Sequence, residues 1–580
     1  MRITTTLQSA RGFLPFPNRW DIVILPAVIG LLFWLGWGLH EMKAPFALGA
    51  PLAVSLAPAN LPEYALRTSL RMGAALLLSL VFTLVYAPIA AKNWRAGQIM
   101  VPVLDVLQSV PILGFLSITV LGFIRLFPGS QLGPEAAAIF AIFTSQAWNM
   151  TFSLYHSLRM VPKELYEAAD VFQLSGWQRF WKVEVPFALP NLVWNTMMSV
   201  SGGWFFVVAS EAISVSGQSI LLPGIGSYIA IAINEQNLAA IGYAIVTMLI
   251  VVLTVDQILF RPLVAWAERF KYEQSVGGEA PTSWMLTLLR RTHLLRMLLA
   301  LPTRLWEWSV RLFRHMPAKP FLHLRFKITR REARLLDRLW SILLILAAVL
   351  SIEFLARFVL SEAGYAEVGH VFLLGLVTGV RVIVLLVLAS IIWVPVGVWI
   401  GLRPRVAQRV QPLALFLAAF PANLLFPLVV SWIVIGRHNP EIWLSPLMIL
   451  GTQWYILFNI IAGAAAIPAD LREAAANLGL KGWALWRRLI LPAIFPAYLT
   501  GGITASGGAW NASVVAEVAS WGSTTLTASG LGAYIAQQTA SGDQPRVALG
   551  IAVMSLYVVA LNRLVWARLY RVAEKRLNLG

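Results

Sequence analysis

Two short segments carry the most regular pattern of charged and small side chains in the sequence. Glu167 begins a Glu-Ala-Ala triplet, and Glu473 begins another one 306 residues later. Each triplet follows a proline, Pro162 or Pro468, of the kind that suits the first turn of a helix. The glutamates then lie near the positive end of a helix dipole, and the alanines leave a surface that another protein can approach closely. The pattern indicates a docking surface, and an ordinary charged loop is the alternative.

A second set of chemically active residues lies inside apolar stretches. Glu211 and Glu517 come near the outer end of two such stretches, on helices that rise about 1.5 Å per residue. A carboxylate at this depth is costly against lipid. It therefore either faces a water-filled cavity or pairs with an arginine and caps neighbouring backbone. A gate or helix-positioning role is favoured.

Tryptophan and glutamine residues accompany these acids. Trp204 and Trp510 come two helical turns before the acids, where their indoles either contact a solute or pack between helices. Gln108 lies in another apolar stretch, just before Pro111, which is expected to break that helix. The candidate residues of a translocation pathway are Gln108, Trp204, Glu211, Trp510 and Glu517.

No residue pattern in the chain indicates catalysis. The sequence has no cysteine, which excludes disulfides, thiolate nucleophiles and cysteine-ligated metals. It has no Gly-Lys dipeptide, so it contains no Walker A phosphate loop. The seven histidines are scattered, and neither His-Glu-x-x-His nor Gly-x-Ser-x-Gly occurs. A membrane-embedded enzyme is a weak alternative, and we expect no metal or cofactor in this chain.

The elements that position these residues are apolar helices. Only 12% of the 580 residues are charged and 58% are hydrophobic, whereas a soluble protein has about a quarter charged residues. Runs of about 20 apolar residues, long enough to cross a bilayer as a helix, recur along the chain. The sequence therefore predicts an all-α polytopic membrane protein. The expected spans are 21–39, 66–91, 100–127, 134–156, 188–212, 238–260, 340–360, 370–401, 410–436, 442–466, 492–518 and 546–569.

The orientation of the spans follows from the basic residues of the loops. Lysine and arginine gather in the loops near residues 92–95, 163–182, 403–409 and 472–488. The loops on the other side carry almost none, and positive loops stay in the cytoplasm. Both termini are therefore expected to be cytoplasmic. The run 21–39 is too long for a cleaved signal peptide, so we expect it to remain as a first span.

The net charge of +18 concentrates in the bridge 261–339, which has 16 basic and 6 acidic residues. Leucine, tryptophan and arginine alternate there at near-helical spacing, which is typical of an amphipathic helix on an anionic membrane surface. A solvated linker between two formerly separate units is the alternative. Because the basic residues lie between apolar spans, the charge does not indicate nucleic-acid binding.

The two halves of the chain repeat each other. Trp177 matches Trp483, and Glu211 matches Glu517, at the same spacing of 306 residues. An even number of spans separates the copies, so the repeat is parallel rather than inverted. The predicted parts are an N-terminal span with its outer loop, 1–60; a first six-helix domain, 61–270; a basic linker, 271–339; the first span of the second half, 340–366; and a second domain, 367–580.

The repeated segment resembles the signature loop of ABC importer permeases. That loop reads Glu-Ala-Ala, three residues, Gly, nine residues, then hydrophobic-x-hydrophobic-Pro. The second copy fits fully, with Gly479 at the turn, whereas the first has Gln173 there. Residues 103–115 and the Gly-[Ile/Leu]-Gly-x-Tyr-Ile pairs look like the nitrate/sulfonate/taurine group of type I importers. The resemblance covers about 61–270 and 367–575, and it implies two permease domains fused in one chain.

The resemblance assigns the signature loops to coupling helices that dock on two cytoplasmic ABC ATPase subunits. The implied coupling residues are Glu167, Ala168, Ala169, Gln173, Glu473, Ala474, Ala475 and Gly479. ATP and magnesium would then be used by those subunits, and a periplasmic or lipid-anchored binding protein would deliver the solute. Because a non-glycine residue in a left-handed turn costs on the order of 1 kcal/mol, the first loop either turns differently or binds its ATPase less well.

The implied function is an ATP-driven importer of the bacterial inner membrane that works by alternating access. The implied substrate is a small anion such as nitrate, bicarbonate, taurine or a sulfonate. A secondary transporter driven by an ion gradient is the main alternative, and an exporter is a third. The secondary transporter does not predict two signature loops, and an exporter is less consistent with them because the loop resembles that of importers.

Overall fold

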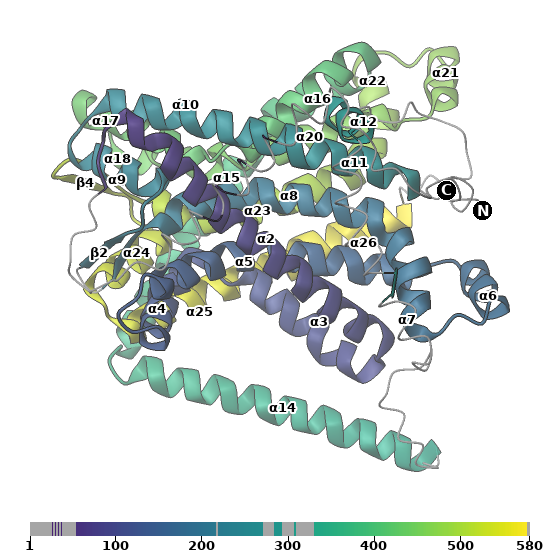
Figure 1. Cartoon of the computed structure of the whole chain (residues 1–580), viewed down its shortest axis with the longest axis horizontal. Coiled ribbons are helices and arrows are strands. Elements are labelled where there is room, and N and C mark those ends of the chain that lie inside the picture. The colour runs from purple at the N-terminus through teal and green to yellow at the C-terminus, as the bar shows by residue number, and fades with distance from the viewer. Residues whose placement is uncertain are drawn as a thin grey trace. The chain divides into compact units, whose positions relative to one another are not determined.

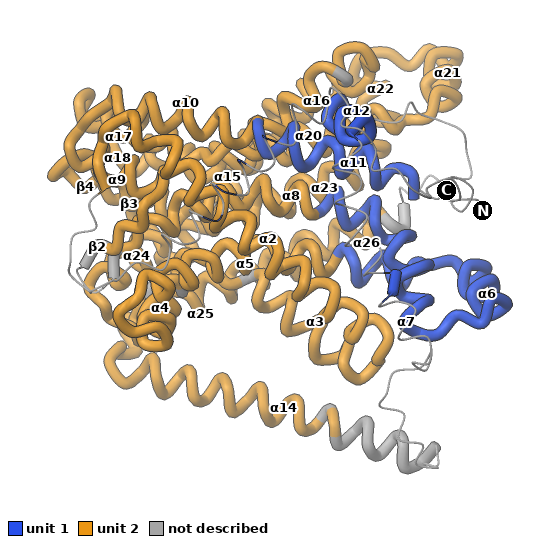
Figure 2. Tube along the Cα trace, in the orientation of Figure 1, with its two compact units in different colours: residues 1–41, 153–195, 254–325 blue, residues 42–152, 196–253, 326–580 orange. Residues whose placement is uncertain are grey.

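Helices account for nearly all of the computed structural model, which describes residues 54–215, 218–270, 283–292 and 330–576, with positions 26, 30, 33, 36, 307 and 308. Most of the expected first span and most of the basic bridge lie outside the described residues. The chain divides into two compact units (Figure 2). Unit 1 comprises 1–41, 153–195 and 254–325, and unit 2 comprises 42–152, 196–253 and 326–580.

The first half starts with a long apolar helix and ends with a pair of helices that follow a short hairpin (Figure 1). Its elements are α2 (Leu61–Lys92), α3 (Trp94–Ser109), α4 (Ile112–Leu126), α5 (Leu132–Arg159), α6 (Lys163–Val171), α7 (Gly176–Arg179), α8 (Val185–Glu211), β1 (Ala212–Val215), β2 (Gln218–Leu221), α9 (Ile225–Asn234), α10 (Leu238–Val255) and α11 (Arg261–Ala267). A π-helical turn joins α7 to α8.

The second half repeats this order after α12 (Trp284–Arg291) and α14 (Arg330–Leu360). Its elements are α15 (Tyr365–Gly401), α16 (Pro404–Ala419), α17 (Phe426–Gly436), α18 (Pro440–Trp443), α19 (Leu447–Leu450), α20 (Gln453–Ala465), α21 (Ala469–Asn477), α22 (Gly482–Leu485), α23 (Leu491–Ala516), β3 (Val518–Trp521), β4 (Thr524–Thr527), α24 (Leu531–Ser541), α25 (Gln544–Leu561) and α26 (Ala567–Arg576). The single helix α5 corresponds to three pieces here, α18 to α20, because Pro446 and Gly451 interrupt the second copy.

The prediction of twelve spans is not confirmed. Within the described residues, seven helices are long and apolar enough to cross a membrane, or nine if two bent pairs each count as one span. The bent pairs are α16 with α17 and α18–α19 with α20. The expected span 100–127 is interrupted between α3 and α4, and α5 is not among the seven. Polar residues of α5, among them Thr144 and Gln146, are buried, so this helix faces protein.

The predicted break at Pro111 is present, and the second half has its counterpart at Pro421. Helix α3 ends at Ser109, and α4 begins after Pro111. Helix α16 ends at Ala419, and a short 3₁₀ turn follows Pro421 before α17. The residue before a proline is driven out of the helical region, and Pro itself lacks the N–H that would continue the ladder. Each half therefore contains a discontinuous helix at the same place in its order.

Each half also has a two-stranded antiparallel hairpin, directly after α8 in the first half and after α23 in the second. Strand β1 pairs with β2 from Ala212 opposite Leu221. Strand β3 pairs with β4 from Val518 opposite Thr527. The second hairpin closes at Gly522, whose φ of 60° suits a tight two-residue turn. Within unit 2, both hairpins lie at the end opposite to α21 (Figure 1).

The core of the second half forms around α20, which packs against α15, α16 and α23. In contrast, the apolar part of α14 is almost wholly exposed, with only 6% of its span buried. Such exposure on a helix of this apolarity is what a lipid-facing surface requires. The described structure therefore has protein-packed helices in each half and one helix that makes few protein contacts.

Candidate functional site

The first signature loop lies on α6 and the turn that follows it. Glu167 and Ala168 are exposed, whereas Ala169 is 2% exposed and anchors the helix. Pro162 is the N-cap residue, one position before the first turn where the sequence places it, and no side chain caps the helix there. Gln173 has φ 49°, which is the left-handed conformation. The loop thus presents its glutamate and one alanine outward and reverses direction within a few residues.

The second signature loop has the same construction on α21. Glu473 and Ala474 are exposed, and Ala475 is buried. Pro468 is the N-cap, and Gly479 has φ 66°. Glycine adopts this conformation without the clash that a Cβ causes. The left-handed turn that the sequence predicts at Gly479 is confirmed.

Of the two alternatives for Gln173, a different turn is not what the structure shows, and weaker ATPase binding stays a prediction. In the first loop, Leu174 N–H donates to the Ala169 carbonyl at 3.0 Å, and in the second, Leu480 N–H donates to the Ala475 carbonyl at 3.0 Å. These equivalent bonds close the C-terminal end of α6 and of α21. The backbone at Gln173 therefore follows the same course as the backbone at Gly479, despite the Cβ of glutamine. The first loop therefore differs in backbone strain, on the order of 1 kcal/mol, and not in course.

Side-chain contacts brace the first loop. Arg179 pairs with Asp170, and its guanidinium lies 5.7 Å from the centre of the Tyr166 ring. Ser175 and Gln178 form a reciprocal capping box at the start of α7. Such a box satisfies two helix-end donors at once. The α6–α7 reversal is therefore held by an ion pair, a ring contact and a cap.

The second loop has different residues at every one of these positions. At the spacing of 306, Ala476 replaces Asp170, Lys481 replaces Ser175, and Leu485 replaces Arg179. Lys481 is the N-cap of α22 and provides no side-chain cap. The described second loop thus keeps the backbone turn but has neither the ion pair nor the capping box.

Tyr166 ties the first loop to the helix that follows it. Burial, together with the nearby Glu184 carboxylate, raises the pKa of Tyr166 to about 12. The phenol therefore stays protonated at neutral pH, where it remains a hydrogen-bond donor. At the matching position the second loop has Arg472.

Both loops expose large apolar side chains. Val171 and Phe172 are 80% and 76% exposed in the first loop. Leu478 and Trp483 are 76% and 71% exposed in the second. Single exposed apolar residues are ordinary, but an aromatic beside an aliphatic residue on a short rigid helix is typical of an interface anchor.

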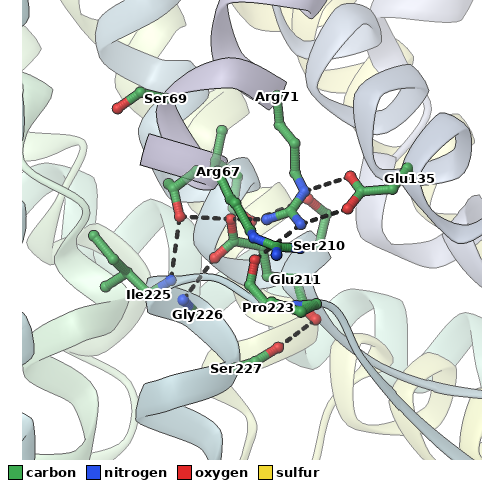
Figure 3. Close-up of polar contacts among 12 residues, drawn as sticks. Arg67, Ser69, Arg71, Glu135, Ser210, Glu211, Pro223, Ile225, Gly226 and Ser227 are labelled. Carbon is green, nitrogen blue, oxygen red and sulfur yellow. Dashed lines mark hydrogen bonds and ion pairs between the residues drawn. The ribbon is translucent and has the colours of Figure 1, made fainter. Parts of the chain in front are cut away.

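The acids predicted in the apolar stretches belong to two ion networks. In the first network, Arg71 donates to both oxygens of Glu135 at 2.6 Å and to Glu211 at 2.6 Å (Figure 3). The side chains of Arg71 and Glu211 are fully buried, and that of Glu135 is 2% exposed. Buried charges of this kind persist only when paired and hydrogen-bonded.

Backbone and hydroxyl groups complete the first network. Thr68 donates its hydroxyl to Glu211 at 2.7 Å and accepts the Ile225 N–H at 3.1 Å. The second oxygen of Glu211 accepts the Gly226 N–H at 2.7 Å. A Cβ at Gly224 would lie 2.4 Å from this carboxylate, so only glycine fits there. The network joins α2, α5, α8 and the start of α9.

The second network repeats this pattern with an open edge. Arg381 donates to Glu517 at 2.8 Å and to Glu441 at 2.9 Å. Thr378 donates to Glu517 at 2.8 Å and accepts the Leu531 N–H at 2.8 Å. Glu517 is 1% exposed, Arg381 11% and Glu441 44%, so water reaches the Glu441 side.

One substitution between the copies accounts for part of this difference. Glu441 accepts the N–H and the hydroxyl of Ser529, at 2.8 and 2.6 Å. The matching residue in the first half is Pro223, which has no N–H and whose carbonyl accepts from Arg71 at 3.0 Å. Glu135 therefore has both oxygens on Arg71, whereas Glu441 divides its oxygens between Arg381 and Ser529.

The tryptophans predicted near these acids are buried. Trp204 and Trp510 are each 2% exposed, and Trp510 lies 6.1 Å from the Tyr557 ring in a stacked arrangement. Gln108 is exposed at the end of α3, just before the break. The contacts of Glu211 and Glu517 match the arginine-pairing, backbone-capping alternative, and they favour helix positioning. Lining of a pathway by the five candidate residues stays a prediction.

Four residues of the networks were not predicted from the sequence. These are Thr68, Glu135, Thr378 and Glu441. Each pair keeps the spacing of the repeat, 310 residues for the threonines and 306 for the glutamates. A search of the repeat for every shared polar residue, rather than for motifs alone, would have found them. Among the described residues, no group of His, Cys, Asp and Glu could hold a metal ion.

Comparison with known proteins gives a consistent result for both halves. The family described as "Binding-protein-dependent transport system inner membrane component" matches residues 79–267 and again 393–578. Both networks and both signature loops have most of their residues within these two regions. Helices α12 and α14, and the part of the bridge after residue 267, lie outside them.

Individual relatives are distant and cover part of the chain. A putative ABC transporter permease protein of Methanocaldococcus jannaschii is 33% identical over 138 residues, 24% of this chain and 50% of that protein. The bicarbonate transport system permease protein CmpB of Synechococcus elongatus is 25% identical over 178 residues, which are 31% of this chain and 58% of that protein. The glycine betaine/proline betaine transport system permease protein ProW of Escherichia coli is 27% identical over 242 residues, which are 41% of this chain and 62% of that protein. The chain thus spans about half to three fifths of these relatives.

Proposed function

Because the chain belongs to the family of inner membrane components of binding-protein-dependent transport systems, we propose that its two halves form the pathway of an ATP-driven importer. The chain is a transport subunit and not an enzyme. In this proposal the halves move between two arrangements, one open to each side of the membrane. The energy for the cycle comes from ATP and magnesium bound by separate ATPase subunits.

The observation that carries this proposal is the pair of signature loops. Each loop presents an exposed glutamate and alanine on a short helix, with a buried alanine behind them and a left-handed residue at its end. A short helix that begins at a proline and is closed at its other end by backbone hydrogen bonds moves as a rigid body. Pressure from a docked partner would therefore pass to α8 and α23, the long helices that follow. A secondary transporter has no use for two such surfaces.

The two partners follow from the two ends of unit 2. We assign the end with α21 to the cytoplasm, where an ATPase would dock. The opposite end carries both hairpins (Figure 1), and a substrate-binding protein would contact it. The basic loops near α21 support this polarity through the positive-inside rule. Inner-membrane location with cytoplasmic termini follows as part of the same proposal.

The two docking surfaces are expected to be unequal. The first is braced by Arg179, Asp170 and a capping box, whereas the second keeps only its backbone turn. Docking on the second loop must therefore order its side chains at an entropic cost. We propose that the first loop binds its ATPase with less reorganisation.

For the substrate we propose a small anion. The motifs of the nitrate/sulfonate/taurine group support this class, as does the similarity to a bicarbonate permease. The similarity to a glycine betaine permease supports instead a zwitterion that carries a carboxylate. A small solute with at least one anionic oxygen group is common to both.

Uptake into proteoliposomes tests the function. The chain is reconstituted with its cognate ATPase and binding protein, and nitrate, bicarbonate, taurine and glycine betaine are offered in turn. ATP-dependent uptake of one of them, unchanged when ion gradients are collapsed with ionophores, is the expected result. Uptake that needs a gradient and ignores ATP would establish the secondary transporter instead.

A further inference from the structure

The break between α3 and α4 leaves a helix start without a cap of its own. Pro111 is the N-cap of α4, and its side chain cannot accept a hydrogen bond. The first N–H groups of a helix have no partner within the helix. The Ile112 N–H instead donates to Oδ1 of Asn511 at 3.0 Å. Ile112 belongs to the first half of the chain and Asn511 to the second.

Asn511 is held in the orientation that this bond requires. Its Nδ2 donates to the Gly507 carbonyl one turn earlier on α23, at 3.2 Å. The preceding residue, Trp510, stacks on Tyr557 of its own half. A step of one residue turns a helix by about 100°. Helix α23 thus anchors itself with Trp510 and presents Asn511 to the other half.

The start of α4 is packed on the second half at the same level. A Cβ at Gly114 would lie 3.0 Å from the side chain of Ile551 on α25. Helix α4 also contacts α23 and α24. Separation of the two halves at this level would remove the cap from α4 together with these contacts.

The repeat does not duplicate this cap. The residue that matches Asn511 is Phe205, and the one that matches Ile112 is Ala422. The corresponding contact in the second half runs the other way, because Asn423 next to Ala422 donates its amide to the Phe205 carbonyl at 3.2 Å. In that bond the Phe205 carbonyl of the first half accepts from the Asn423 side chain. It does not cap a backbone N–H at the break after Pro421.

We propose that Asn511 is a latch that closes the translocation pathway by capping α4 from the opposite half. The inference deepens the proposed function. Asn511 comes about 30 Å along α23 from the α22 end, at ~1.5 Å per residue, so the latch is nearer to the hairpins. When the halves separate on that side, water must replace Oδ1 at the Ile112 N–H, and when they close the latch reforms.

The size of the effect follows from the cost of an uncapped helix. Loss of a side-chain cap costs about 1 kcal/mol, which is about a fivefold change in an equilibrium. Asn511→Ala is therefore expected to raise the fraction of molecules open on the hairpin side about fivefold. Asn511→Asp loses the bond to the Gly507 carbonyl, but it keeps an acceptor for the Ile112 N–H and adds a charge that a helix N-terminus favours, so it should lower that fraction or leave it unchanged.

Thiol labelling of the otherwise cysteine-free chain measures this fraction. Gly507→Cys provides the probe, since a Cβ at Gly507 meets no atom within 4 Å. The full chain in nanodiscs is labelled with a charged maleimide with its ATPase absent. The Asn511→Asp variant should label at the rate of the parent protein or more slowly. The Asn511→Ala variant should label about fivefold faster than the parent. Asn459→Ala is the matched control, because its amide donates to Tyr455 in its own helix, and it should label like the parent.

The order of rates decides the proposal. Equal labelling of the Asn511 and Asn511→Ala proteins would overturn the latch, and so would fast labelling of Asn511→Asp. If the Asn511→Ala variant were unfolded, its labelling would not respond to added binding protein. The labelling rate of the Asn511→Asp variant would then still decide whether the latch exists. Because no ATP is used, the latch can fail while ATP-driven uptake succeeds, or hold while that uptake fails.

Discussion

Arg71 and Glu211 form an ion pair of 2.6 Å in which both side chains are fully buried. They come from α2 and α8, which are separated by 140 residues in the chain. Their counterparts, Arg381 and Glu517, form a pair of 2.8 Å with 11% of the arginine exposed. The same ion pair thus occurs in both halves of the chain. It is shielded from water in the first half and partly accessible to water in the second.

The sealed network should contribute more to stability than the open one. Removing one partner of a buried pair leaves an uncompensated charge and costs about 3–5 kcal/mol. Arg71→Met is expected to lower the free energy of unfolding by this amount. Arg381→Met should cost less than half as much, because water reaches the Glu441 side. Thermal unfolding of the two purified variants checks this, and equal losses would show that exposure does not matter here.

The glycine before α9 and its counterpart before α24 should tolerate no side chain. A Cβ at Gly224 would lie 2.4 Å from the Glu211 carboxylate, and one at Gly530 would lie 2.3 Å from that of Glu517. Gly224→Ala and Gly530→Ala are each expected to reduce the yield of folded protein severely. The control is Gly73→Ala, where nothing lies within 4 Å. The amount of folded protein recovered from size-exclusion chromatography distinguishes the variants from the control. Normal recovery of either variant would show that the glycine is not required beside the carboxylate.

Relief of backbone strain should stabilise the first signature loop. Gln173 has φ 49°, and glycine adopts this conformation freely. Gln173→Gly is expected to slow amide exchange in α6 by up to about fivefold, the equivalent of about 1 kcal/mol. Gly479→Gln should speed exchange in α21 by a similar factor. Faster exchange in α6 after Gln173→Gly would mean that the glutamine side chain contributes more than the strain costs.

The bracing of the first loop is testable by making it resemble the second. Arg179→Leu introduces the residue found at the matching position, Leu485, and removes the pair with Asp170. Amide exchange in α6 and α7 should then rise toward the rates of α21 and α22. The expected change is modest, below about 1 kcal/mol, because Asp170 is exposed. If exchange in α6 stayed the same, the capping box alone would account for the order of the loop.

The sequence predicts local features well and long-range pairing poorly. The breaks at Pro111 and Pro421 and the left-handed turn at Gly479 follow from properties of single residues, and all are present. A change of course at Gln173, one of the two alternatives for that residue, is absent, because the closing hydrogen bonds override a strain of this size. Local preference is a weak guide where the surrounding structure fixes the backbone.

The buried networks depend on contacts that no local pattern specifies. Periodicity could indicate that Glu211 needs a partner, but Arg71 is 140 residues away and Glu135 lies on a third helix. Within the sequence, only the repeat contains this information, because the residues recur together at a nearly constant spacing. Asn511 lacks even that signal, since its counterpart is Phe205.

The central claim is that the two signature loops dock on ATPase subunits, and co-purification measures this most directly. The chain is expressed with its ATPase, and the bound ATPase is quantified for Glu167→Ala, Glu473→Ala and the double variant. Glu353→Ala, on α14 outside the family regions, is the control. We predict two ATPase subunits per chain, loss of most ATPase from the double variant, and unequal loss from the two single variants. Full retention of ATPase by the double variant, or none on the parent chain, would contradict the account.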